Sequence, residues 1–177
     1  MLIYRTKRVQ IETRTVSLPN GRTPEYLFVK PVSAVCILPV DEEYVYLIRQ
    51  YRAVIDAYII EAPAGGMDHE GESPEDAVRR ELAEETGMKA ESLIPRGFVY
   101  TSPGFCTEKI WLYEARGLTP CSGYDMDEDE VIEQVKIPVR DIPSMICSGE
   151  ISDAKTIAVL SRVLFGKGPS GVNEKTD

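Results

Sequence analysis

The 177-residue chain has the length of one domain with a modest extension, and its 43% hydrophobic content is enough for a packed core. Its net charge of −9 argues against a nucleic-acid-binding surface, and no stretch approaches the roughly 20 apolar residues of a membrane span. A polyanionic substrate would therefore need metal ions and a local arginine in order to bind.

The first part of the chain is rich in strand signals. Residues 2–16 and 25–30 alternate in polarity around a turn at Pro19-Asn20-Gly21. Short apolar strands follow over residues 32–38, 44–48 and 57–61. We expect residues 1–40 to form an added antiparallel β layer, and the charged alternation of the first residues argues against a signal peptide.

Helices and strands alternate in the second part. The expected helices cover residues 74–86, 140–148 and 153–164, and the expected strands lie near residues 93–100, 108–115 and 131–137. Mixed strands flanked by helices predict an α/β domain over residues 41–165. Residues 166–177 have the composition of a disordered tail.

Cysteine and histidine usage restricts the chemistry. The four cysteines show no paired metal spacing and nothing suggests secretion, so we expect reduced thiols in a cytoplasmic protein. With His69 as the single histidine, neither a Ser-His-Asp triad nor a histidine-rich zinc site can be built. Acid–base chemistry must then use carboxylates or metal-bound water, and such hard oxygen ligands suit Mg²⁺ or Mn²⁺.

The expected helix over residues 74–86 has clear ends and an acidic face. Ser73 is a good N-cap, and Gly87 is a natural C-terminal stop. Glu81, Glu84 and Glu85 fall within roughly a 100° arc, where like charges repel and call for a compensating divalent cation. Charge pattern alone more often means a solvated face that pairs with neighbouring arginines such as Arg79 and Arg80.

The spacing around this helix favours the metal. Gly66, five residues, Glu72, seven residues and then residues 80–88 (RELAEETGM) resemble the Nudix box at every defining position. In that family the segment is a loop–helix–loop that holds Mg²⁺ against a diphosphate. The resemblance implies an α/β/α Nudix sandwich with a mixed sheet. It also implies two or three Mg²⁺ ions per site, with Mn²⁺ possible, on the ligands Gly65 (through its carbonyl), Glu81, Glu84 and Glu85. Arg80 would orient these glutamates, and Glu85 would be essential to catalysis.

Three further segments resemble the ADP-ribose pyrophosphatase subfamily: residues 49–52 (RQYR), 61–66 (EAPAGG) and 102–108 (SPGFCTE). Alone, Arg52 would be a surface cation, Glu61 a solvated strand end, and Pro103-Gly104 a plain turn. Together around an intact box they imply substrate-binding residues. Arg52 would grip the diphosphate and Glu108 would contact the terminal ribose side, while Glu61, Pro103 and Gly104 complete the expected set.

The acidic run at residues 125–130 (DMDEDE) has two open interpretations. A calcium loop starting at Asp125 fails, because its sixth position is Glu130 rather than Gly and its twelfth is Lys136 rather than Glu. A solvated loop is the plain alternative. The family resemblance instead implies a catalytic glutamate just before the strand over residues 131–137. Glu128 is the first candidate and Glu130 the second.

The resemblance implies Mg²⁺-dependent hydrolysis of ADP-ribose to AMP and ribose 5-phosphate. One alternative is a hydrolase of another nucleoside diphosphate sugar or of an oxidised nucleoside diphosphate. A second is a regulator that binds ADP-ribose without cleaving it, although such modules typically lose the metal-binding glutamates.

The resemblance also implies a homodimer in which the N-terminal layer crosses to the partner and helps to wall the adenine site. The alternative is a layer that packs on its own subunit.

Overall fold

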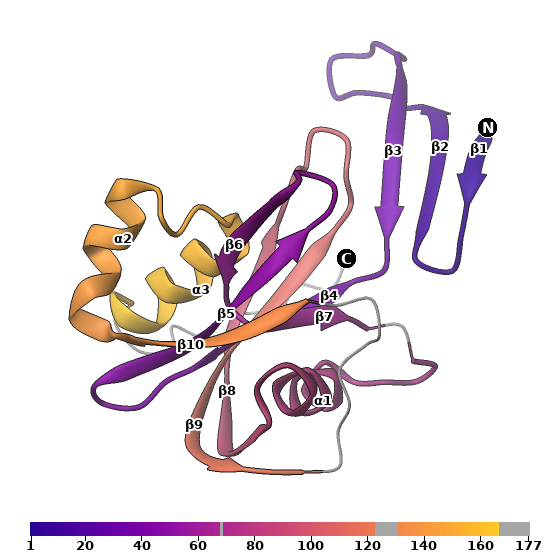
Figure 1. Ribbon diagram of the computed structural model, residues 1–177. Coiled ribbons are helices and arrows are strands. Elements are labelled where there is room, and N and C mark those ends of the chain that lie inside the picture. Colours follow the sequence, from indigo (N-terminus) through magenta and orange to yellow (C-terminus); the bar gives the residue numbers. More distant parts are fainter. Residues whose placement is uncertain (68, 123–130, 167–177) are drawn as a thin grey trace.

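The computed structural model describes residues 1–67, 69–122 and 131–166, which form a mixed α/β fold (Figure 1). Its strands are β1 (Leu2–Arg5), β2 (Val9–Thr15), β3 (Glu25–Pro31), β4 (Ala34–Pro39), β5 (Tyr44–Arg52), β6 (Ala57–Glu61), β7 (Ala64–Gly66), β8 (Met88–Tyr100), β9 (Lys109–Pro120) and β10 (Ile132–Pro138). Its helices are α1 (Pro74–Thr86), α2 (Ile142–Ser148) and α3 (Ala154–Leu164), with a 3₁₀ turn at Val139–Asp141. The predicted fold, an α/β domain with an N-terminal antiparallel layer, is confirmed.

The central sheet has the strand order β7-β4-β9-β8, with β4 parallel to β9 and the other pairs antiparallel. Strand β4 is buried on both faces. Val35 and Ile37 join the apolar cluster under α1, whereas Cys36 and Leu38 join the larger cluster under α2 and α3. This alternation holds α1 on one face of the sheet and α3 on the other, as Figure 1 shows.

A second sheet, with the order β10-β5-β6, is antiparallel throughout. It carries Arg52 at the last position of β5 and Glu61 at the last position of β6. Three residues after Glu61, at Ala64, the chain enters β7 in the central sheet. The segment from Glu61 to Gly66 therefore links the two sheets.

The N-terminal sheet, β1-β2-β3, projects away from the rest of the chain (Figure 1). Backbone bonds tie its β3 to the loop before β9: Val29 N–H donates to the Phe105 carbonyl at 2.8 Å, and Thr107 N–H donates to the Val29 carbonyl at 2.9 Å. This sheet ends at Pro31, and β4 already belongs to the central sheet.

The expected strand over residues 2–16 is instead a hairpin of β1 and β2. The hydroxyl of Thr6 accepts hydrogen bonds from the backbone N–H of Arg8 (3.2 Å) and of Val9 (3.0 Å), which closes the turn. Alternation alone does not reveal such a break, because the side-chain period is the same on both sides of it.

Strands β5 and β9 run past their expected ends, to Arg52 and Pro120. Strands β7 and β8 differ more clearly from expectation. Strand β7 was not expected, because its Ala-Gly-Gly sequence lacks β-branched residues; it forms by pairing with β4. Strand β8 begins at Met88 rather than near residue 93, because the left-handed Gly87 (φ 62°) turns the chain directly out of α1. In the part of the chain that the structure describes, no helix is long and apolar enough to cross a membrane.

Candidate functional site

Helix α1 begins and ends where its sequence predicts. The Ser73 side chain accepts a hydrogen bond from the N–H of Asp76, Pro74 occupies the first turn, and the N–H of Gly87 donates to the Ala83 carbonyl. Val78 and Leu82 are fully buried against the central sheet. These contacts fix the rotation of the helix and hence the direction of its acidic face.

The acidic face of α1 is not solvated. Glu81 is 8% exposed and Glu85 is 2% exposed, while Glu84 is half-buried. Removing a carboxylate from water costs free energy unless hydrogen bonds or cations compensate it. The interpretation of the acidic face as a solvated surface is therefore wrong for Glu81 and Glu85.

Arg80 lies at the centre of this acidic cluster. Its guanidinium bonds Glu72 through Nε (2.9 Å) and Nη2 (3.2 Å), and its Nη1 bonds both Glu81 (2.6 Å) and Glu84 (3.0 Å). Its Nη2 also donates to the Gly66 carbonyl at 2.9 Å. The bonds to Glu72 are the largest of the effects that raise the pKa of Arg80, so the group stays charged while it orients the carboxylates.

Strand β7 lies directly against the two buried glutamates. The N–H of Ala64 donates to Glu85 Oε2 at 2.9 Å. The carboxylate of Glu81 occupies the space that a side chain at Gly65 would need, since an added Cβ would lie closer than 3.0 Å to all three carboxylate atoms. Glycine is thus required here by a close approach. Of the predicted metal ligands, Gly65, Glu81 and Glu85 meet at this contact.

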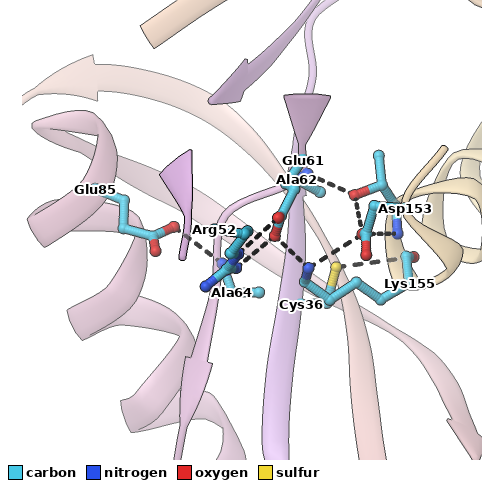
Figure 2. A network of polar contacts seen from close by, with 9 residues as sticks. Cys36, Arg52, Glu61, Ala62, Ala64, Glu85, Asp153 and Lys155 are labelled. Carbon is cyan, nitrogen blue, oxygen red and sulfur yellow. Dashed lines mark hydrogen bonds and ion pairs between the residues drawn. The ribbon is translucent and has the colours of Figure 1, made fainter. Parts of the chain in front are cut away.

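Arg52 and Glu61 form a second charged group beside the first (Figure 2). Arg52 donates to the two carboxylate oxygens of Glu61, through Nε at 2.7 Å and through Nη2 at 2.5 Å. These hydrogen bonds raise the pKa of Arg52, and the nearby charge of Glu85 acts in the same direction. Glu61 is 1% exposed, whereas the Arg52 side chain is 38% exposed. The arginine therefore keeps donors for a ligand while its carboxylate partner is buried.

The loop before β9 carries the other expected residues. Pro103 and Gly104 line a cavity of about 210 Å³ together with side chains of the N-terminal sheet, among them Tyr26 and Phe28. Glu108 is half-buried just before β9. None of the residues that line this cavity belongs to α1. Glu128 and Glu130, the candidates for the loop carboxylate, lie outside the described residues.

Sequence reasoning missed three residues that hold the Arg52–Glu61 group: Asp153, Lys155 and Thr156 at the start of α3. Asp153 could have been recognised as an N-cap, because it precedes an apolar helical repeat and accepts from the N–H of Thr156. The contact of Lys155 with Glu61 carries no local signal, since the two residues are 94 positions apart.

The donor set of the cluster fits a hard divalent cation. It consists of carboxylate oxygens beside the backbone of β7, and Gly65 leaves room for a carboxylate against the strand. Within residues 1–67, 69–122 and 131–166, no three acidic, histidine or cysteine side chains converge as a ready-made metal site. Oxygens of Glu81 and Glu84 already pair with Arg80, so a bound metal would have to share these two carboxylates with the arginine.

Comparison with known proteins agrees with this geometry. The family model described as NUDIX domain matches residues 30–159. The ADP-ribose pyrophosphatase of Bacillus subtilis (strain 168) is 36% identical over 156 residues, which cover 87% of this chain and 84% of the relative. A GDP-mannose pyrophosphatase of Yersinia enterocolitica is 38% identical over 127 residues, which cover 66% of this chain and 64% of the relative.

Two more likenesses extend over most of the chain. A protein of Bacillus methanolicus named methanol dehydrogenase activator is 33% identical over 157 residues, which cover 88% of this chain and 84% of the relative. The solved structure described as an ADP compounds hydrolase superposes with a TM-score of 0.82 and 26% identity, covering 93% of this chain and 89% of the other. The matched region contains α1, β7 and Arg52.

Proposed function

Because the chain belongs to the Nudix family, we propose that it hydrolyses the diphosphate bond of ADP-ribose and releases AMP and ribose 5-phosphate. The family and the relatives make it a pyrophosphohydrolase. The observation that carries the substrate class is the juxtaposition of two groups: buried glutamates of α1 against Gly65, and a half-exposed Arg52 beside them.

Nudix hydrolases generally depend on a divalent metal. In this proposal Glu81, Glu84, Glu85 and the Gly65 carbonyl hold two or three Mg²⁺ ions, or Mn²⁺ in their place. Bound cations would neutralise the diphosphate oxygens and lower the pKa of an attacking water. Arg80 keeps the glutamates in place by bonding Glu72, Glu81 and Glu84 at once.

The remaining roles belong to the chain's own side chains. Arg52 binds a non-bridging oxygen of the diphosphate, for which a guanidinium fork is well suited. Glu128 removes a proton from the attacking water, and Glu130 is the alternative in the same segment. Glu108 contacts the terminal ribose, and the cavity beside Pro103 and Gly104 offers apolar surface for a further part of the substrate.

The alternative substrate is another nucleoside diphosphate sugar, because several relatives from Yersinia are named for GDP-mannose. Product formation should be measured over ADP-ribose, GDP-mannose, other nucleoside diphosphate sugars and oxidised nucleoside diphosphates, with Mg²⁺, with Mn²⁺ and with a chelator. The proposal requires metal-dependent release of AMP from ADP-ribose at the highest kcat/KM of the set. Turnover of none of these compounds would refute it and would leave the non-catalytic regulator as the better hypothesis.

The partner in this proposal is a second copy of the chain, joined through the N-terminal sheet. Four apolar side chains on that sheet are between 45% and 56% exposed: Leu2, Ile3, Tyr4 and Leu27. Exposed apolar patches of this kind often mark a protein–protein interface. Light scattering should give twice the 19.8 kDa chain mass, and Leu2→Ser with Tyr4→Ser should lower it. A wild-type mass near 20 kDa at micromolar concentration would refute the dimer.

The four cysteines are free thiols, which supports a cytoplasmic location.

A further inference from the structure

We infer that Lys155, at the start of α3, is a positioning residue for diphosphate binding: it holds Glu61 from one side so that Glu61 holds Arg52 from the other. The inference rests on the proposed function, because it assigns to Lys155 an effect on the affinity of that same site. Lys155 donates to Glu61, whereas the proposal assigns the diphosphate to Arg52. An effect of Lys155 on substrate affinity must therefore pass through Glu61 and Arg52.

The carboxylate of Glu61 is shared between two cations (Figure 2). Its Oε1 accepts from Arg52 Nε, and its Oε2 accepts from both Arg52 Nη2 and Lys155 Nζ. Glu61 is 1% exposed and the Lys155 side chain is 14% exposed, so water screens this contact weakly. A buried carboxylate that loses one of its partners leaves uncompensated charge, which is costly.

Lys155 is itself fixed by the start of α3. Its Nζ lies 3.1 Å from Asp153 Oδ2, the same oxygen that accepts from the N–H of Thr156 at 2.9 Å. Burial alone would lower the pKa of Lys155, but the charges of Asp153 and Glu61 outweigh it and raise that pKa, so the ammonium stays protonated. The adjacent Thr156 hydroxyl accepts from the N–H of Ala62 at 2.7 Å. Neighbouring residues of α3 thus hold neighbouring residues of the segment that leads to β7.

Lys155 sets the net charge that a polyanionic ligand meets at this group of side chains. Arg52, Lys155, Glu61 and Asp153 together are neutral, since two positive and two negative side chains cancel. Without Lys155 the group carries one net negative charge, and Arg52 alone must satisfy Glu61. The guanidinium is then drawn toward the carboxylate, and the site repels the diphosphate more strongly. Substrate affinity should fall while the chemical step, which Lys155 does not touch, is kept.

The test is a double-mutant cycle on steady-state kinetics with ADP-ribose. Lys155→Met should raise KM on the order of ten-fold and change kcat by less than about three-fold. Lys155→Arg, which keeps the charge, should recover most of the affinity. In a Glu61→Gln background, Lys155→Met should change KM by less than about two-fold, because its partner carboxylate is already neutral. Lys89→Met, at an exposed lysine on β8, controls for the lost net charge and should leave KM unchanged.

A merely structural role would give a different pattern. Lys155→Met would then lower the unfolding temperature and leave KM unchanged, or would raise KM equally with and without Glu61; either result overturns the inference. If Lys155→Met does not fold, Lys155→Gln keeps a donor to Glu61 without the charge and must still raise KM. Calorimetric titration with inorganic pyrophosphate gives a readout without turnover, and its affinity must fall in the same variants. Absence of any wild-type turnover refutes the proposed function instead, and the pyrophosphate titration then decides the role of Lys155.

Discussion

Gly65→Ala would separate the geometry of the acidic site from the stability of the fold. The added Cβ would lie closer than 3.0 Å to the carboxylate atoms of Glu81, which must move by about 1 Å or more to reach an ordinary contact distance. Because the clashing atoms are the far end of a flexible side chain, the fold should lose no more than about 1 kcal/mol. A displacement of about 1 Å at a catalytic centre, however, can cost on the order of 100-fold in rate.

Three measurements on the variant check this expectation: kcat for ADP-ribose, the Mg²⁺ concentration at half-maximal rate, and the rise in melting temperature with Mg²⁺. We expect kcat to fall about 100-fold and the Mg²⁺-dependent rise to shrink, since stabilisation by a ligand follows its affinity for the folded state. Gly66→Ala is the matched control, because its Cβ would meet only Val32 Cγ2 at an acceptable 3.4 Å. Wild-type kcat and wild-type Mg²⁺ dependence in Gly65→Ala would show that the contact between Glu81 and β7 has no part in the reaction.

Three further predictions concern single side chains. Glu85→Gln should leave the fold intact, cut turnover by at least about 100-fold and weaken the Mg²⁺-dependent rise in melting temperature; wild-type turnover at saturating Mg²⁺ would exclude this carboxylate as a ligand. Glu128→Gln should lower kcat by about 100-fold with little change in KM, and if Glu130→Gln proves the more damaging change, Glu130 is the general base. Burial raises the pKa of Cys36, so thiol reagents should modify the exposed Cys147 in the native protein and reach Cys36 only on unfolding; rapid native labelling of Cys36 would contradict its burial.

Much of the acidic site could be predicted from sequence because it is local. The caps at Ser73 and Gly87 set the limits of α1, and the helical period then places Glu81, Glu84 and Glu85 on one side. What the period cannot show is how far the acidic side is itself buried. The burial of Glu81 and Glu85 depends on the sheet beneath the helix, so a solvated face remained open until the structure placed β7 against it.

The contacts of the Arg52–Glu61 group could be predicted only in part. Glu61 follows it by nine positions, within reach of a two-stranded pairing, and the family resemblance had already joined the two in one site. Lys155 lies on α3 at the far end of the chain and reaches Glu61 only because β4 holds α3 on the face opposite α1. Such a contact follows from the packing of the layers, which no short-range pattern contains.

The charges of the two groups differ, and the difference bears on how the substrate binds. Glu72, Glu81, Glu84 and Glu85 with Arg80 carry four negative charges and one positive charge, which leaves three net negative charges beside Gly65. The group around Arg52 is neutral as a whole and offers a guanidinium on its exposed side. A diphosphate that approached these side chains alone would be repelled by the first group more strongly than the second attracts it. We therefore expect productive binding to require cations with or before the substrate, and the affinity for ADP-ribose to depend steeply on the concentration of divalent metal.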